Sequence, residues 1–87
     1  MSNNDKPCRS LTVRSAGVAE SFFVVHGREA FELGDVETSI WSLCDGTYTI
    51  GDISRQISAE FNVDEDVAFS DVTAFIAEMR DANLLER

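Results

Sequence analysis

The chain has 87 residues, 44% of them hydrophobic and 26% charged, and its 16 acidic residues against seven Lys and Arg give a net charge of −9. This length supports one domain with a modest core and excludes two. Because such a surface repels phosphate backbones and anionic lipid headgroups, the charge argues against nucleic acid or a membrane as partner.

Cysteine usage and hydropathy indicate the compartment. Cys8 and Cys44 are far apart and form no CxxC or Cys/His cluster, so we expect no disulfide, no metal site and no cofactor. The start MSNNDKPCRS lacks a signal-peptide apolar core, and no apolar run approaches the roughly 18 residues that span a membrane. We therefore expect a cytoplasmic protein, and a monomer.

The N-terminal part is polar and then becomes apolar. Residues 1–10 contain the only proline, Pro7, and we expect a disordered tail there, followed by a single domain over residues 11–87. One strand is expected somewhere within Leu11–Glu20, where apolar and polar residues partly alternate.

A hairpin is expected next. The aromatic and β-branched run Phe22–Val25 predicts a strand, and His26-Gly27 predicts a tight turn because glycine takes positive φ without steric cost. Glu29–Leu33 predicts the returning strand, with Phe31 and Leu33 on one face.

After the hairpin the apolar period changes from two to about 3.6, which predicts helices. Asp35 is expected to cap a helix that runs to about Cys44, and Asp45-Gly46 to end it. Thr49 and Asp52 predict a capping box at the start of a second helix. The apolar stripes of the two helices are Val36, Ile40, Trp41, Leu43 and Cys44, and Ile50, Ile53, Ile57 and Phe61.

A third helix is expected from about Asp66 to Ala82, after a break at NVDED, with Ala68, Val72, Phe75 and Met79 on its core face. Strands first and three helices afterwards, the last two joined by a short connector, predict an α+β fold. We expect a winged helix-turn-helix with about three N-terminal antiparallel strands.

Two functional classes fit the residues poorly. A winged helix can bind DNA, but Asp64–Ala82 carries six carboxylates against the single Arg80, a net charge of −5 that phosphates would repel. The only histidine, His26, lies in a predicted turn, and no nucleophile arrangement, metal-ligand spacing or phosphate loop occurs. We therefore expect a protein that is neither DNA-binding nor an enzyme.

Several short fragments occur along the chain, and their order and spacing together are more specific for one protein family than any single fragment is. They are Phe31-Glu32-Leu33, Ile40-Trp41, Cys44-Asp45-Gly46, Thr49 with Ile53, Asn62-Val63-Asp64, Asp71-Val72, Phe75-Ile76 and Leu84-Leu85. Together, over about residues 18–87, they resemble the PqqD-like family, the RiPP recognition elements. One departure is Leu33-Gly34, where the family usually has Leu-Asn before the first helix.

The resemblance implies a non-catalytic module that binds the leader segment of a ribosomally made precursor peptide. Such a module delivers the leader to a modifying enzyme, often a radical-SAM enzyme, or to a leader peptidase. The resemblance also implies that the leader adds as an antiparallel strand beside the last hairpin strand, with side chains in the groove between that strand and the third helix. The alternative is a general protein-interaction domain that docks a biosynthetic enzyme.

Two elements supply the candidate peptide-binding residues. An edge strand exposes unpaired backbone groups, although its charges could equally serve only to prevent self-pairing. On the third helix, Phe69 and Ile76 form a second apolar shoulder that either walls the groove or packs against the hairpin or the second helix. The predicted site comprises Arg28, Glu29, Ala30, Phe31, Glu32 and Leu33 from the strand, and Phe69, Val72, Thr73, Ile76 and Arg80 from the helix.

Overall fold

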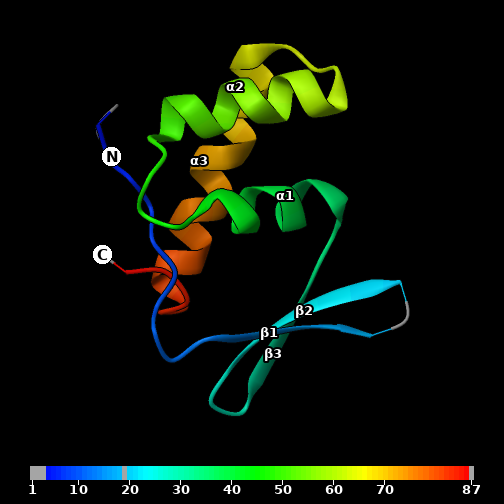
Figure 1. The fold of residues 1–87 in the computed structure, drawn as a ribbon, viewed down its shortest axis with the longest axis vertical. Coiled ribbons are helices and arrows are strands. Elements are labelled where there is room, and N and C mark those ends of the chain that lie inside the picture. Colours follow the sequence, from blue (N-terminus) through cyan, green and yellow to red (C-terminus); the bar gives the residue numbers. More distant parts are fainter. Residues whose placement is uncertain (1–3, 19, 87) are drawn as a thin grey trace.

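The computed structural model describes residues 4–18 and 20–86, and it shows an antiparallel sheet followed by three helices (Figure 1). The elements are β1 (Arg14–Val18), β2 (Ser21–His26), β3 (Glu29–Leu33), α1 (Asp35–Leu43), α2 (Ile50–Phe61) and α3 (Glu65–Asp81). The predicted α+β fold, with three strands before three helices, is confirmed. None of the helices in the described part of the chain is long and apolar enough to cross a membrane.

The sheet has the strand order β1-β2-β3, so β3 lies at one edge. β2 and β3 pair from Phe22 with Leu33 to His26 with Glu29. The turn therefore occupies residues 27 and 28, one position later than predicted, because His26 still belongs to the ladder. Gly27 takes φ 62°, a conformation that glycine adopts without steric cost.

The core is one cluster of buried residues that joins the three helices to β2 and β3. β2 and β3 contribute Val24 and Leu33, which are 0% and 7% exposed. The predicted helix stripes are confirmed as apolar and inward-facing, with Val36, Leu43 and Phe61 half-buried at the margin. The buried helical residues of the core are Ile40, Trp41, Ile50, Ile53, Ile57, Ala68, Val72, Phe75, Ile76 and Met79.

The helix caps follow the local sequence with one exception. The Thr49 hydroxyl accepts a hydrogen bond from Asp52 N, and Thr49 N donates to the Asp52 carboxylate, each at 3.1 Å, so the predicted capping box is confirmed. The predicted Asp35 cap of α1 is wrong, because the N-cap is Gly34. Asp35 instead lies in the first turn, where the negative charge of its carboxylate interacts favourably with the positive end of the helix dipole.

The segment before β1 lies across the ends of the helices and does not form the expected disordered tail. Pro7 is fully buried, and the backbone of residues 5–10 is hydrogen-bonded to the loops that follow α1 and α3 and to the start of α2. The bonds are Ile50 N to Asp5 O, Gly46 N to Pro7 O, Glu86 N to Cys8 O, Arg9 N to Cys44 O and Ser10 N to Leu84 O, at 2.8–3.0 Å.

The prediction of disorder relied on the polar composition of this segment, and polarity alone does not show whether its backbone has hydrogen-bond partners elsewhere in the chain. Helix ends leave N–H and C=O groups without intrahelical partners, and an extended segment can satisfy them. The expectation of disorder is therefore wrong for residues 5–10, while residues 1–3 lie outside the described part of the chain.

Candidate functional site

The outer edge of β3 has open backbone groups. His26 and Glu29 flank the two-residue turn and form the pair that closes the ladder. Since hydrogen-bonded pairs recur at every second residue of an antiparallel ladder, Phe31 and Leu33 also bond to β2. The N–H and C=O groups of Ala30 and Glu32 therefore point away from the sheet. This edge can accept one further antiparallel strand.

A groove of about 660 Å³ separates this edge from α3. Three of its apolar residues, Leu33, Phe75 and Met79, are at most 7% exposed and belong to the core, whereas Phe31 is half-buried. The complete lining is Ala30, Phe31, Glu32 and Leu33 from β3, Glu37 from α1, and Asp71, Ala74, Phe75, Glu78 and Met79 from α3. The groove thus combines an apolar floor with a polar rim directly beside the open strand edge.

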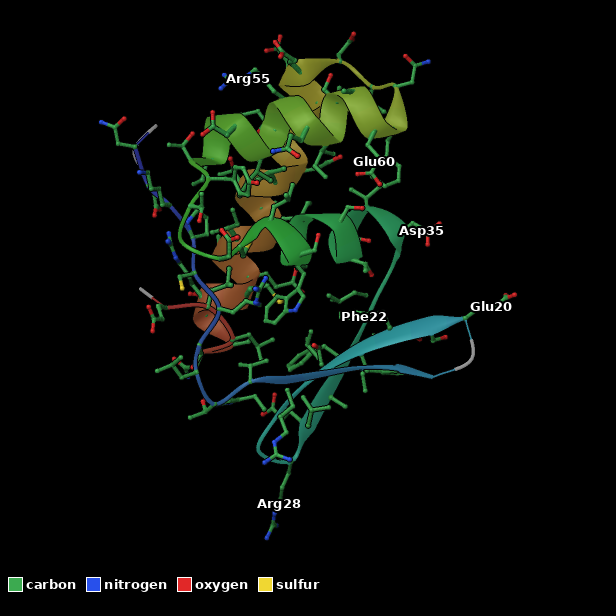
Figure 2. All side chains as sticks on the ribbon, viewed as in Figure 1. Glu20, Phe22, Arg28, Asp35, Arg55 and Glu60 are labelled. Atoms are coloured by element: carbon green, nitrogen blue, oxygen red, sulfur yellow. The ribbon has the colours of Figure 1, made fainter. Side chains whose placement is uncertain are left out.

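The structure brings most of the predicted strand residues to this groove. The four residues from Ala30 to Leu33 line it, whereas Arg28 and Glu29 do not. Arg28 lies in the turn, and its side chain extends away from the rest of the molecule (Figure 2). The predicted strand residues thus coincide with the groove lining from Ala30 to Leu33, while Arg28 and Glu29 lie outside it.

The predicted helix residues do not line the groove. Val72 and Ile76 are 0% exposed within the core, so neither is accessible to a ligand. Phe69 is 42% exposed, but it lines a different hollow, together with α2 residues such as Gly51. Ile76 therefore packs inside the protein, which was the alternative interpretation of the apolar shoulder. The prediction that Phe69 and Ile76 wall the groove is wrong.

Two further predicted residues, Thr73 and Arg80, also lie outside the groove lining. Thr73 is partly buried, and its hydroxyl has no hydrogen-bond partner among the described residues. Arg80 donates to the Asp5 carboxylate and to the backbone carbonyl of Glu86. The sequence prediction missed Asp71, Ala74 and Glu78, which flank the apolar stripe of α3 on its other side. The sequence feature that could have indicated this side of the helix was Ala74, a small residue next to the apolar stripe.

A second hollow, of about 440 Å³, lies between β2, the start of α1 and the end of α2. Glu20, Phe22, Asp35 and Glu60 line it and are labelled in Figure 2. Phe22 and Leu33, which both contribute to it, pair with each other inside the sheet. This hollow therefore offers no open strand edge, unlike the groove beside α3.

The groove lining consists of apolar and acidic side chains and contains no histidine, cysteine, serine or threonine. Among the described residues no group of three or more His, Cys, Asp or Glu side chains could hold a metal ion. Burial raises the pKa of the Cys44 thiol to about 12, so this side chain stays protonated at neutral pH and is a weak nucleophile.

The comparison with known proteins agrees with this geometry. The family model of coenzyme PQQ synthesis protein D (PqqD) matches residues 22–85, and the chain belongs to this family. The resemblance inferred from the sequence is thereby confirmed. No curated protein sequence matches the chain.

Three solved structures are similar along nearly the whole chain. TbiB1 in complex with the TbiA(beta) leader peptide is 28% identical, with a TM-score of 0.80 over 91% of this chain and 94% of that one. The PqqD truncation of Methylobacterium extorquens PqqCD, a functional and stand-alone RiPP recognition element, is 22% identical, with a TM-score of 0.84 over 99% and 94%. Lasso peptide synthetase B1 complexed with the leader peptide is 15% identical, with a TM-score of 0.84 over 95% and 100%. At these identities the last two show the shared fold alone.

Proposed function

We propose that this chain binds the leader segment of a ribosomally made precursor peptide and presents it to a modifying enzyme of natural-product biosynthesis. The observation that carries the proposal is the open edge of β3 at Ala30 and Glu32, directly beside the groove along α3. Membership of the PqqD family supports it, as does the similarity to TbiB1, which was solved with a leader peptide.

The leader would bind as a fourth strand, antiparallel to β3. The N–H and C=O groups of Ala30 and Glu32 allow four backbone hydrogen bonds, each contributing roughly 0.5–1.5 kcal/mol. Alternate leader side chains would enter the groove and cover Phe31 and Phe75, and each apolar side chain buried in full would contribute roughly 1.5–3 kcal/mol. Backbone bonds would thus provide affinity, and the groove would select the side chains.

In this proposal the module is non-catalytic and acts in the cytoplasm as a monomer. Its partner would be a radical-SAM enzyme or a leader peptidase, which performs the chemistry. The composition of the groove lining supports a role in recognition alone. Glu29 and Glu32 support the monomeric state, because like charges on an edge strand oppose pairing between two copies.

The test is an amide titration of the full chain with the leader of a short precursor encoded beside its gene. We expect shifts at Ala30, Glu32 and Ala74, and slower hydrogen exchange of the Ala30 and Glu32 amides on binding. A saturating titration that leaves β3 unchanged would contradict the proposal. Shifts confined to β1 or α2 would instead favour the alternative of a general protein-interaction domain.

A further inference from the structure

We infer that the peptide held in this groove is cationic, and that it carries Lys or Arg both on its outer face and along the rim facing α3. This inference rests on the proposed function, and it specifies the chemical class of leader that the site selects. It is carried by four observations: the charge of the rim, the placement of the chain's own cations, the alternation of an added strand, and the total charge.

The rim of the groove is acidic on both sides. Glu32 projects from β3, while Asp71 and Glu78 project from α3, and all three side chains are exposed. Glu37 of α1 is half-buried at the same groove. The residues that line the groove include no Lys, Arg or His. A bound strand would therefore lie between carboxylates on its two sides.

Among the residues that the structure describes, no salt bridge joins a cation of the chain to these carboxylates. The salt bridges of the described residues join Arg55 to Asp52 and Arg80 to Asp5, away from the groove lining. Arg9 donates to the backbone carbonyl of Trp41 at 2.7 Å. Arg28 points away from the molecule at the tip of the hairpin (Figure 2). The groove carboxylates thus have no ion-pair partner among the described residues, and a bound cationic peptide would supply the counter-charges.

The geometry of an added strand distributes these counter-charges between its two faces. Successive side chains alternate between faces, so those on the outer face would lie beside Ala30 and Glu32. Those on the inner face would lie over Phe31 and Phe75, close to the carboxylates of α3. Lys and Arg suit both places, because their apolar stems cover a hydrophobic floor while their charged ends reach the rim.

The total charge argues against a second copy of the chain as the occupant. Two copies would each bring a charge of −9, and pairing their β3 edges would place carboxylates beside carboxylates. A cationic peptide would instead be attracted from a distance, which accelerates association and makes it dependent on ionic strength.

A selection from a displayed library of random 12-residue peptides on the full chain tests this inference. We expect the enriched peptides to carry net positive charge and to shift the amides of Ala30 and Glu32. Enriched peptides that shift these amides but are neutral or acidic would overturn the inference and leave the proposed strand addition intact. If no enriched peptide shifts β3, both the inference and the proposed function fail.

Two variants with the same total charge distinguish the effect of the groove carboxylates from the effect of the chain's overall negative charge. Neutralising the rim with Glu32→Gln, Asp71→Asn and Glu78→Gln should weaken an enriched peptide about 3- to 100-fold, since exposed ion pairs contribute roughly 1.4- to 5-fold each. The matched control neutralises Glu20→Gln, Glu60→Gln and Asp66→Asn, which do not line the groove, and should change affinity less than threefold. Equal losses in both variants would show non-specific attraction and overturn the inference.

Discussion

Arg80 near the end of α3 donates two hydrogen bonds to the carboxylate of Asp5, 75 residues earlier in the chain, at 2.5 and 2.8 Å. Both side chains are largely shielded, with 16% and 21% of their surfaces exposed. Together with the backbone bonds of residues 5–10, this pair attaches the N-terminal segment to the helices. The pair belongs to the framework of the domain and lies outside the groove.

Replacing Asp5→Asn should therefore destabilise the fold in a pH-dependent way. The hydrogen bonds from Arg80 hold the pKa of Asp5 below its ordinary value. A lowered folded-state pKa gives stability that is present above the unfolded pKa, near 4, and is lost as pH falls through the folded pKa. Urea unfolding should show a deficit of about 1–2 kcal/mol at pH 7, a size typical of charged hydrogen bonds.

At pH 3 the deficit of Asp5→Asn should be smaller than at pH 7, because the unfolded wild-type chain takes up a proton on Asp5 below its ordinary pKa near 4, whereas the ion pair opposes that protonation in the folded chain. Glu20→Gln serves as control and should match the wild type at both values, because Glu20 is exposed and its side chain forms no ion pair among the described residues. An equal deficit at pH 7 and pH 3 would contradict the role assigned to the ion pair.

The cysteines should differ in reactivity. Cys44 is 0% exposed and its thiol donates to the Ile40 carbonyl at 3.2 Å, whereas Cys8 is partly exposed. Since burial raises the pKa of Cys44 to about 12, a disulfide reagent should modify Cys8 first and reach Cys44 only on unfolding. Mass spectrometry of the labelled peptides checks this. Rapid labelling of Cys44 in the folded chain would show that the core is open there.

Local sequence determined the parts of this fold that depend on neighbouring residues. The Thr49–Asp52 capping box and the limits of β3 were predicted correctly because their partners lie within a few positions. The course of residues 5–10 was not predicted correctly, because the hydrogen-bond partners of this segment, at Cys44, Ile50 and Leu84, are distant in the chain.

The candidate site divides in the same way. The strand half follows from alternation and turn chemistry, which are local. The helix half depends on which flank of α3 packs against α2, and periodicity alone gives two equivalent flanks beside the Ala68–Val72–Phe75–Met79 stripe. The structure places Phe69 near α2 and Ala74 at the groove.

Filling the groove should block leader binding. Ala74 is exposed and lines the groove, so Ala74→Tyr would place an aromatic ring where leader side chains are expected. We expect affinity to fall about tenfold or more, because the tyrosine ring would prevent at least one apolar leader side chain from binding. Fluorescence anisotropy with a labelled leader measures this.

Ala77→Tyr is the matched control, because Ala77 is exposed on the same helix and does not line the groove. Its affinity should stay within twofold of the wild type, as should that of Phe69→Asp, whose site lies near α2. If Ala77→Tyr or Phe69→Asp weakened binding as much as Ala74→Tyr, the groove would be wrongly placed.

The central claim, that the leader pairs with the open edge of β3, is tested most directly by proline substitution at the two sheet edges. Ala30→Pro removes an outward N–H without breaking a bond to β2, and edge strands tolerate proline at such positions. Ser15→Pro does the same at the opposite edge, since the alternation along β2 directs the Ser15 N–H outward as well. Circular dichroism verifies that both variants fold.

The measurement is the dissociation constant of the leader for these two folded variants. Ala30→Pro should weaken binding about tenfold, through one lost hydrogen bond and the proline ring at the contact, while Ser15→Pro should bind like the wild type. A folded Ala30→Pro variant that binds the leader as tightly as the wild type would contradict strand addition at β3.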